Sequence, residues 1–473
     1  MNAPALILMA ALAQTPAQAP APTLTQVLTL EQVLQEAQAN NPDLQVARAR
    51  LEQAQLLSRK AWANYLPQIS AGGSYTRNNA EAKLQMPTGY YIRQMPDDST
   101  GGPPFDPTKL PSAENPPGAA SPYIMFPSGY ADMTIQGKNQ VGAQIQLQQA
   151  LIVPALWPAI QSTYLAEKVV DLNVENARRE LLFAVAQLYY GAATLKETVA
   201  VQKRLLANNE AHERDAKVRF EAGTVPKIQL VRAQIDTARA EQDVRRAENS
   251  YASAKVALAT LLSRDDANFE VQAPEPPAPP EGSPEDLVAK AASERLDVLA
   301  ANKSIELAKK GKQGALAKYL PNLFLTGAYR WANVKGFTGE STSWNVGLAL
   351  SWNLFDGGLR EAELKEHDSK IVEAKAARRS AELKARDEVL RSIIDLESAQ
   401  ANRVKAEEQL KLAQENTQLV RVNFNAGVAT QLDVSDASAM LAGAEMGVVA
   451  ETLNAELAAL RLAKAAGAFD PAK

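Results

Sequence analysis

The sequence lacks cysteine entirely and holds only two histidines, His212 and His367. The absence of cysteine excludes a disulfide framework, a catalytic thiol, a thiolate zinc site and a lipid-modified cysteine. Both histidines fall among charged residues in stretches that read as long helices, so a histidine triad or metal site is not expected. No glycine-rich phosphate-binding loop of either common type occurs. We therefore predict that the protein is not an enzyme and binds no metal or cofactor.

Positive charge is not in excess, and long hydrophobic runs are missing. The 50 Lys and Arg residues are outnumbered by 54 Asp and Glu residues, giving a net charge of −4, so nucleic acid is not an expected partner. No run of about 18 apolar residues follows the amino-terminal segment, so no helix is expected to span a bilayer. Aromatic residues make up only 6%, and alanine is abundant in polar stretches. This composition favours long helices with narrow helix–helix seams.

The amino-terminal segment decides the expected compartment. Residues 5–13 form a short apolar run, and a tract of small residues ending at Ala19 follows it. This pattern predicts a secretory signal peptide over residues 1–19, although Lys and Arg are missing ahead of the apolar run. The alternative is a disordered tail rich in Ala, Pro and Gln. An exported chain without cysteine fits the bacterial envelope.

The chain contains one large internal duplication. Three blocks recur in the same order in both halves: Tyr65-Leu66-Pro67 as Tyr319-Leu320-Pro321, Val141-Gly142 as Val346-Gly347, and Phe220-x-Ala-Gly223 as Phe424-x-Ala-Gly427. We predict a first structural repeat over residues 29–272 and a second over 283–467, joined by a Pro-rich linker at 273–282.

Each half is predicted to contain a helix, a strand, a loop, a second strand and a long helical hairpin. Residues 359–424 contain no Pro or Gly, and residues 159–220 contain only Gly191. Helices of about 60–66 residues span roughly 90–100 Å, a length typical of coiled coils. The returning helix of the first half carries apolar or small residues at 3,4 spacing between 230 and 261, which predicts a coiled-coil seam. Gly223 and Gly427 fall at the hairpin turns, where a left-handed conformation is expected.

Four short segments, near 69–75, 141–148, 323–329 and 345–353, alternate between apolar and polar residues. Such alternation over about 8–10 residues is typical of a membrane β-barrel with its polar face toward the lumen. The alternative is a small soluble sheet with one wet face. The polar face favours the barrel because it carries uncharged residues where a wet surface usually carries Lys and Glu. We predict these lumen residues: Gln140, Gln144, Gln146, Gln148, Asn345, Ser351 and Asn353.

Two further features favour the barrel. All five tryptophans lie in or next to these segments, as an interfacial girdle would place them. Four strands cannot close a barrel, and an open edge is not tolerated in lipid, so the barrel requires an oligomer; three chains would supply twelve strands. The 78–138 segment, rich in Pro, Gly, Ser and Asp, is expected to be a long irregular extracellular loop, in contrast to the short 332–343 loop.

In these features the chain resembles the TolC-like outer-membrane efflux protein family. The resemblance rests on the duplicated halves, the Tyr-Leu-Pro blocks, the Phe-x-Ala-Gly turns and the run Asn353-Leu-Phe-Asp-Gly-Gly358 after the fourth segment. It implies a mixed α/β membrane protein: a homotrimer with a twelve-stranded outer-membrane β-barrel, four strands per chain, continued by a long α-helical coiled-coil tunnel in the periplasm. The first half departs from the pattern, because Ile152-Val153-Pro154 replaces the Asp-Gly-Gly turn. The two long helices are therefore expected to start differently.

The resemblance also implies function. Such proteins are passive exit ducts of tripartite efflux pumps or type I secretion systems, embedded in outer-membrane lipid and docking on a periplasmic adaptor and an inner-membrane transporter. The alternative is an envelope coiled-coil scaffold that transports nothing. The turns at Phe220, Gly223, Phe424 and Gly427 would meet the adaptor.

Asp433 and Asp436 lie three residues apart just beyond the second turn, so they are expected on one helix face. By themselves they are more simply interpreted as surface carboxylates near a helix N-terminus, where the helix dipole favours negative charge. The matching stretch of the resembled family carries a similar aspartate pair, which implies a periplasmic gate and cation-selectivity ring. The first half has Gln229 and Arg232 at the corresponding positions.

Overall fold

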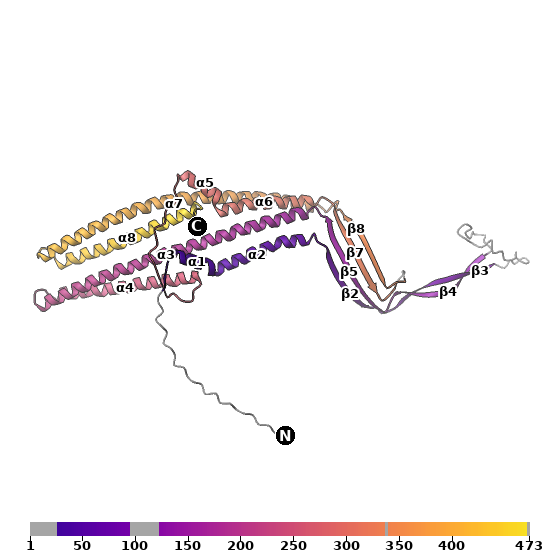
Figure 1. The fold of residues 1–473 in the computed structure, drawn as a ribbon, viewed down its shortest axis with the longest axis horizontal. Helices are drawn as coiled ribbons and strands as arrows, with labels where there is room; N and C mark the ends of the chain where they lie inside the picture. The colour runs from indigo at the N-terminus through magenta and orange to yellow at the C-terminus, as the bar shows by residue number, and fades with distance from the viewer. Residues whose placement is uncertain (1–25, 95–122, 336–338, 471–473) are drawn as a thin grey trace, which may run out of the picture. The chain divides into compact units, whose positions relative to one another are not determined.

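The computed structural model describes residues 26–94, 123–335 and 339–470. The chain divides into two compact units. The first is formed by residues 1–55, 165–307 and 371–473, and the regular elements of its described residues are helices apart from one pair of three-residue strands. The second, formed by residues 56–164 and 308–370, holds the remaining strands and the helical segments next to them. Figure 1 labels the elements along the chain.

Two helices, a group of strands and two further helices follow one another in both halves, with four strands in the first group and two in the second. In the first half the helices are α1 (Leu30–Asn40), α2 (Pro42–Ala63), α3 (Leu156–Glu221) and α4 (Lys227–Leu262). In the second half they are α5 (Pro284–Glu294), α6 (Leu296–Ala317), α7 (Leu359–Asn425) and α8 (Gln431–Ala465). Among the described residues no helix combines the length and the apolarity that crossing a membrane requires.

The two long helices have the predicted length. Helix α3 contains 66 residues and α7 contains 67, which at 1.5 Å per residue is about 100 Å each. Gly191 lies inside α3 without ending it. Each long helix is followed by a returning helix, α4 or α8, that lies beside it (Figure 1). The predicted seam of α4 is confirmed, since its buried residues include Ala233, Ala240, Val244 and Leu258.

The core of the helical unit lies where the short elements pack on the hairpins. One cluster joins α1 to α3 and α4 and contains the three-residue strands β1 (Gln26–Leu28) and β6 (Phe269–Val271), which pair in parallel. Within it the Tyr189 hydroxyl is fully buried and lies 2.8 Å from the carbonyl oxygens of both Leu28 and Gln272. A second cluster joins α5 to α7 and α8. These clusters connect segments far apart in the sequence.

A four-stranded antiparallel sheet forms the centre of the second unit. Its strands are β2 (Gln68–Arg77), β5 (Asn139–Ile152), β7 (Asn322–Ala332) and β8 (Thr342–Ser351), in the order β2-β5-β7-β8. The four alternating segments of the sequence are therefore strands, as predicted. The register is regular except for one shift in β5 between Ala150 and Ile152.

The expectation of an irregular loop over 78–138 is wrong for much of that segment. Strands β3 (Ala82–Gln94) and β4 (Tyr123–Gln136) form an antiparallel hairpin of their own. The sequence pattern did not predict this hairpin, because proline lacks the backbone N–H that donates a hydrogen bond in a strand pair and therefore normally argues against a strand. Here Pro87 and Pro127 both pair next to register shifts of a two-stranded ribbon, where an interrupted ladder is tolerated. Residues 95–122 lie outside the described part of the chain.

The two long helices start differently, as predicted. Helix α7 follows Gly357 and Gly358, whose φ angles are +72° and +88°. Its first turn is held by a buried ion pair in which Arg360 Nε lies 2.7 Å from Asp356 Oδ2. Helix α3 instead begins just after Pro154, and the Leu156 amide donates to the Val153 carbonyl. A short turn without positive φ therefore replaces the glycine turn in the first half.

Candidate functional site: the strand faces and the hairpin tips

The register of the sheet gathers the predicted lumen residues on one face. Gln146 lies opposite Ser70 on β2 and Ala328 on β7, and Ala328 lies opposite Asn345 on β8. Directly opposed residues of an antiparallel pair point to the same side, and the side alternates along each strand. One face therefore carries Gln140, Gln144, Gln146, Gln148, Asn345 and Ser351. Asn353 is not brought into this set, because it lies beyond the end of β8.

The opposite face of the sheet is apolar and exposed in the single chain. Across it, Ile145 lies opposite Ala71 and Tyr329, and Tyr329 lies opposite Trp344. Leu348 is 67% exposed and Trp344 is 74% exposed. Removing such a side chain from water is worth about 1.5–3 kcal/mol. The register also places polar side chains on this face, among them Gln149 and, at the end of the sheet, Arg77 and Asn139. An exposed face that is otherwise apolar marks a surface that is covered in the working protein.

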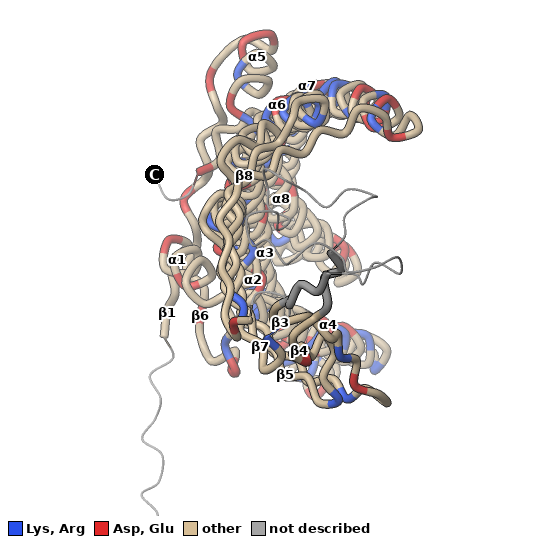
Figure 2. The backbone as a smooth tube through the Cα atoms, turned by 90° about the vertical axis from the view of Figure 1, so that its right-hand side faces the viewer, with Lys and Arg blue, Asp and Glu red and all other residues tan. Residues whose placement is uncertain are grey.

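The four strands are almost free of charge. Among β2, β5, β7 and β8 the only charged residues are Arg77 and Arg330, whereas Figure 2 shows Lys, Arg, Asp and Glu gathered on the helices. Arg330 lies on the polar face and its Nη1 donates to Asn345 Oδ1 at 2.9 Å. The sequence analysis missed Arg330. The sequence signal for it was a charge on the same strand face as Thr326 and Ala328, which lie four and two residues earlier.

The tryptophans fall at both ends of the sheet. Trp331 and Trp344 lie at one end, and Trp352 follows the other end, where its Nε1 donates to the Tyr319 carbonyl at 3.1 Å. The eight residue-to-residue steps from Trp344 to Trp352 span about 27 Å at 3.4 Å per step. At a strand tilt of about 40° this becomes about 21 Å, close to the roughly 25 Å apolar band of outer-membrane barrels. The remaining pair, Trp62 and Trp157, makes an edge contact at 6.5 Å between ring centroids.

Both hairpin turns contain a glycine in the left-handed region. The φ angles of Gly223 and Gly427 are +73° and +76°, which confirms the expected conformation. The Thr224 amide donates to the Arg219 carbonyl, and the Val428 amide donates to the Asn423 carbonyl, closing each helix end in the same way. A Cβ at either glycine would meet no atom within 4 Å. The requirement for glycine is therefore a matter of backbone conformation and not of space.

The aromatic residues beside the turns connect the two hairpins. The Arg219 guanidinium lies 5.0 Å from the ring centroid of Phe424, a cation–π contact between the end of α3 and the end of α7. Phe220 is partly exposed next to it. Phe424 thus takes part in a link between hairpins even though its side chain carries no polar group.

The two predicted gate aspartates have different surroundings. Asp433 accepts hydrogen bonds at 2.7 Å from both the backbone amide and the hydroxyl of Thr430, the N-cap of α8. These donors lower the pKa of Asp433, and the arrangement is a capping box. Asp436 is exposed and borders a cavity of about 610 Å³ that Gln229 and Arg232 also line. Asp433 does not line that cavity.

Among the described residues, no group of three or more His, Asp or Glu side chains is placed so that it could hold a metal ion.

The comparisons with known proteins agree with this geometry. The model of the outer membrane efflux protein family matches residues 33–100 and 287–468. The outer membrane protein TolC of Escherichia coli strain K12 is 22% identical over 95% of this chain and 84% of its own length. Among solved structures, the outer membrane protein VceC of Vibrio cholerae has a TM-score of 0.69 at 20% identity, covering 93% of this chain and 96% of its own. The CmeC outer membrane channel of Campylobacter jejuni has a TM-score of 0.71 at 16% identity, covering 94% and 87%. The chain belongs to the outer membrane efflux protein family.

Proposed function

We propose that this protein is the outer-membrane exit duct of a tripartite efflux pump or a type I secretion system. Its family consists of channels, and the fold combines a homotrimeric, twelve-stranded outer-membrane β-barrel with a long α-helical tunnel in the periplasm. This chain supplies four strands and two helical hairpins. The duct is passive, so export is driven by an inner-membrane transporter that meets it through a periplasmic adaptor.

The observation that carries this proposal is the two-faced sheet. One face is exposed and apolar, and the other carries uncharged Gln, Asn and Ser side chains. A soluble sheet normally buries its apolar face in a core. In the wall of a membrane β-barrel, lipid-facing and lumen-facing residues alternate along each strand. The sheet also ends in two open edges, β2 and β8, which three copies would close by pairing with one another.

Each proposed part of the duct is assigned to a segment of the sequence. Residues 1–19 would be the signal peptide, 29–272 and 283–467 the two repeats, and 273–282 the linker. The lumen would be lined by Gln140, Gln144, Gln146, Gln148, Asn345, Ser351 and Asn353, with Arg330 added on the polar face. The tips at Phe220, Gly223, Phe424 and Gly427 would meet the adaptor.

Asp433 and Asp436 are proposed as the periplasmic gate and selectivity ring. Three-fold symmetry would bring six carboxylates together at the narrow end, and acidic rings select cations. Both side chains are exposed in the single chain, which supports this role. The capping box of Asp433 adds a structural role to the same residue.

The test separates the duct from a non-transporting envelope scaffold. The full-length protein is expected to fractionate with outer membranes, to run as a trimer and to form pores in planar lipid bilayers. A soluble monomer without pore activity would favour the scaffold. Copurification of native partners with a tagged chain would then identify the adaptor and the transporter, and through them the class of cargo.

A further inference from the structure

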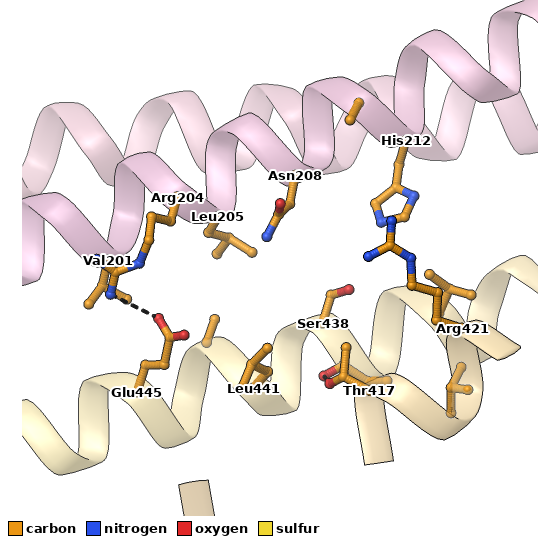
Figure 3. Close-up of a pocket in the computed structure, with 15 residues that line it drawn as sticks. Val201, Arg204, Leu205, Asn208, His212, Thr417, Arg421, Ser438, Leu441 and Glu445 are labelled. Atoms are coloured by element: carbon orange, nitrogen blue, oxygen red, sulfur yellow. Dashed lines mark hydrogen bonds and ion pairs between the residues drawn. The ribbon is translucent and has the colours of Figure 1, made fainter. Parts of the chain in front are cut away.

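A small cavity separates the first helical hairpin from the second. Asp433 and Asp436 do not line it, although their chain neighbours Val434 and Ala437 do. Its volume is about 220 Å³, and its walls come from α3 on one side and from α7 and α8 on the other. Figure 3 shows His212 and Asn208 of α3 facing Arg421, Thr417 and Ser438 of the second hairpin across this space. Every one of these side chains carries a polar group, although apolar residues also line the cavity.

The fixed charges around the cavity leave one cation uncompensated. Glu445 is occupied by Arg204, whose Nη2 lies 3.2 Å from Glu445 Oε2. Asp215, next to His212 on α3, is occupied by Arg219 at 2.9 Å. Figure 3 marks the Arg204–Glu445 pair but no ion pair of Arg421 among the residues drawn. The guanidinium of Arg421 therefore faces the cavity beside the imidazole of His212 without an acidic partner there.

The pKa of His212 is lowered in these surroundings. Burial is the largest cause that lowers the pKa of His212, and Arg421 lowers it further, while Asp215 acts in the opposite direction. His212 also lines the larger cavity of about 610 Å³. The charged groups that line the two cavities are Arg204 on α3, Arg232, Asp236 and Arg239 on α4, Arg421 on α7, and Asp436 and Glu445 on α8. Asp215 on α3 lines neither cavity but acts on His212 electrostatically.

The size of the smaller cavity limits what it can hold. Drug-sized ligands need pockets of about 300–1,000 Å³, so exported drugs do not fit. A water molecule takes about 30 Å³ of liquid volume, so a small ion with some of its water does fit. Guanidinium groups match the geometry of sulfate, phosphate and carboxylate oxygens, and hydrogen bonds between charged partners are about twice as strong as neutral ones.

We propose that this cavity binds a small free oxyanion of sulfate or phosphate size between Arg421 and His212, with Asn208 and Ser438 as further donors. Because His212 belongs to the first hairpin and Arg421 to the second, the bound anion ties the two hairpins together near their tips. The site does not use the side chains of Asp433 or Asp436. It goes beyond the proposed export function, which needs no bound ion.

Both the stability of the packed hairpins and the binding of the anion are expected to depend on pH. Without an anion, protonation of His212 next to Arg421 places two positive charges together, so the packed hairpins lose stability as the pH falls through the lowered pKa of His212. An anion between them stabilises the imidazolium, so the pKa of His212 rises. Anion binding is therefore expected to strengthen as the medium becomes acidic.

The experiment uses the fact that the chain has only two histidines. In the full-length trimer with ¹³C-labelled histidine, the variant His367→Asn identifies the His212 resonance. The pH titration of His212 is followed in sodium sulfate and in sodium chloride at equal ionic strength. Sulfate is expected to raise the His212 pKa by about one pH unit, the size of effect that an opposite charge produces at contact. The change should saturate with sulfate concentration, and the His367 resonance should not follow it.

Matched variants decide whether Arg421 holds the ion. Arg421→Gln is expected to raise the His212 pKa in chloride, because the repulsion is removed, and to abolish the additional effect of sulfate. Arg421→Lys should retain part of that effect. Arg214→Gln serves as the control, since Arg214 lies on α3, the helix of His212. It is exposed, does not line the cavity and pairs with Glu210. Equal titrations in sulfate and chloride, or a sulfate effect that survives in Arg421→Gln, would overturn the proposal.

Discussion

Placing arginine on the apolar face of the sheet tests the membrane assignment directly. Leu348 lies midway between Trp344 and Trp352, and its side chain is 67% exposed. If this face meets lipid, Leu348→Arg puts a charge near the bilayer midplane at a cost of about 2–4 kcal/mol. That cost corresponds to a roughly 30- to 900-fold change in the equilibrium between folded and unfolded protein.

The structure adds a depth dependence to this prediction. Ile145 lies on the same face, but it is opposite Tyr329, which is itself opposite Trp344 at the aromatic end of the sheet. An arginine near the interface costs only about 0–1 kcal/mol. Ile145→Arg is therefore expected to be milder than Leu348→Arg.

Gln146→Arg is the matched control, because Gln146 is the chain neighbour of Ile145 and points to the polar face. It should assemble normally. The assay is the yield of trimer in phospholipid vesicles, followed by unfolding of the trimer in urea. Equal damage from Leu348→Arg and Gln146→Arg would show that the face assignment is wrong. No loss in Leu348→Arg would show that the face does not meet hydrocarbon.

Four further predictions concern the helical unit. Val at Gly223 or Gly427 forces a β-branched residue into the left-handed region at a cost of roughly 1–2 kcal/mol. We expect these variants to lose efflux while the amount of trimer stays normal. Normal efflux in the double variant would show that these turns do not dock on the adaptor. In single-channel recordings, Asp433→Ala/Asp436→Ala should lose cation preference and block by multivalent cations, while unchanged selectivity in an assembled trimer would exclude the ring. Because the pKa of Asp433 is lowered, its charge should persist as the pH falls through the range where an ordinary aspartate is protonated, and cation preference measured against pH should show this. Tyr189→Phe removes a buried hydroxyl from its backbone partners and should lower the free energy of unfolding by about 0.5–1.5 kcal/mol per lost hydrogen bond, which calorimetry or a urea titration can measure.

Local chemistry made much of the architecture predictable. The proline-free and nearly glycine-free stretches became α3 and α7, because nothing in them interrupts backbone hydrogen bonding. Gly223 and Gly427 ended these helices in the left-handed region, since only glycine adopts it without strain. The alternating segments became strands because period-two alternation suits only a sheet with two different faces. In each case the residues that carry the signal are close together in the chain.

Some features were visible in the sequence but were weighed wrongly. Thr430 and Asp433 have the spacing of a capping box, yet the sequence analysis considered Asp433 only for the gate and for the helix dipole. The β3–β4 hairpin was missed because Pro87 and Pro127 argue against strands when the pairing partner is unknown. Arg330 was passed over because a single charge in a strand has no evident role until Asn345 is found beside it.

The sequence by itself determined the helices, the turns and the two faces of each strand, because these depend on backbone preferences and periodicity over a few residues. Only the tertiary structure decided which distant residues share a site. The strand order β2-β5-β7-β8 joins the two halves in one sheet and places Gln146 in line with Asn345. The packing of the two hairpins brings Arg219 to Phe424 and His212 to Arg421. Contacts of this kind depend on how separate elements pack together, and no local pattern in the chain encodes them.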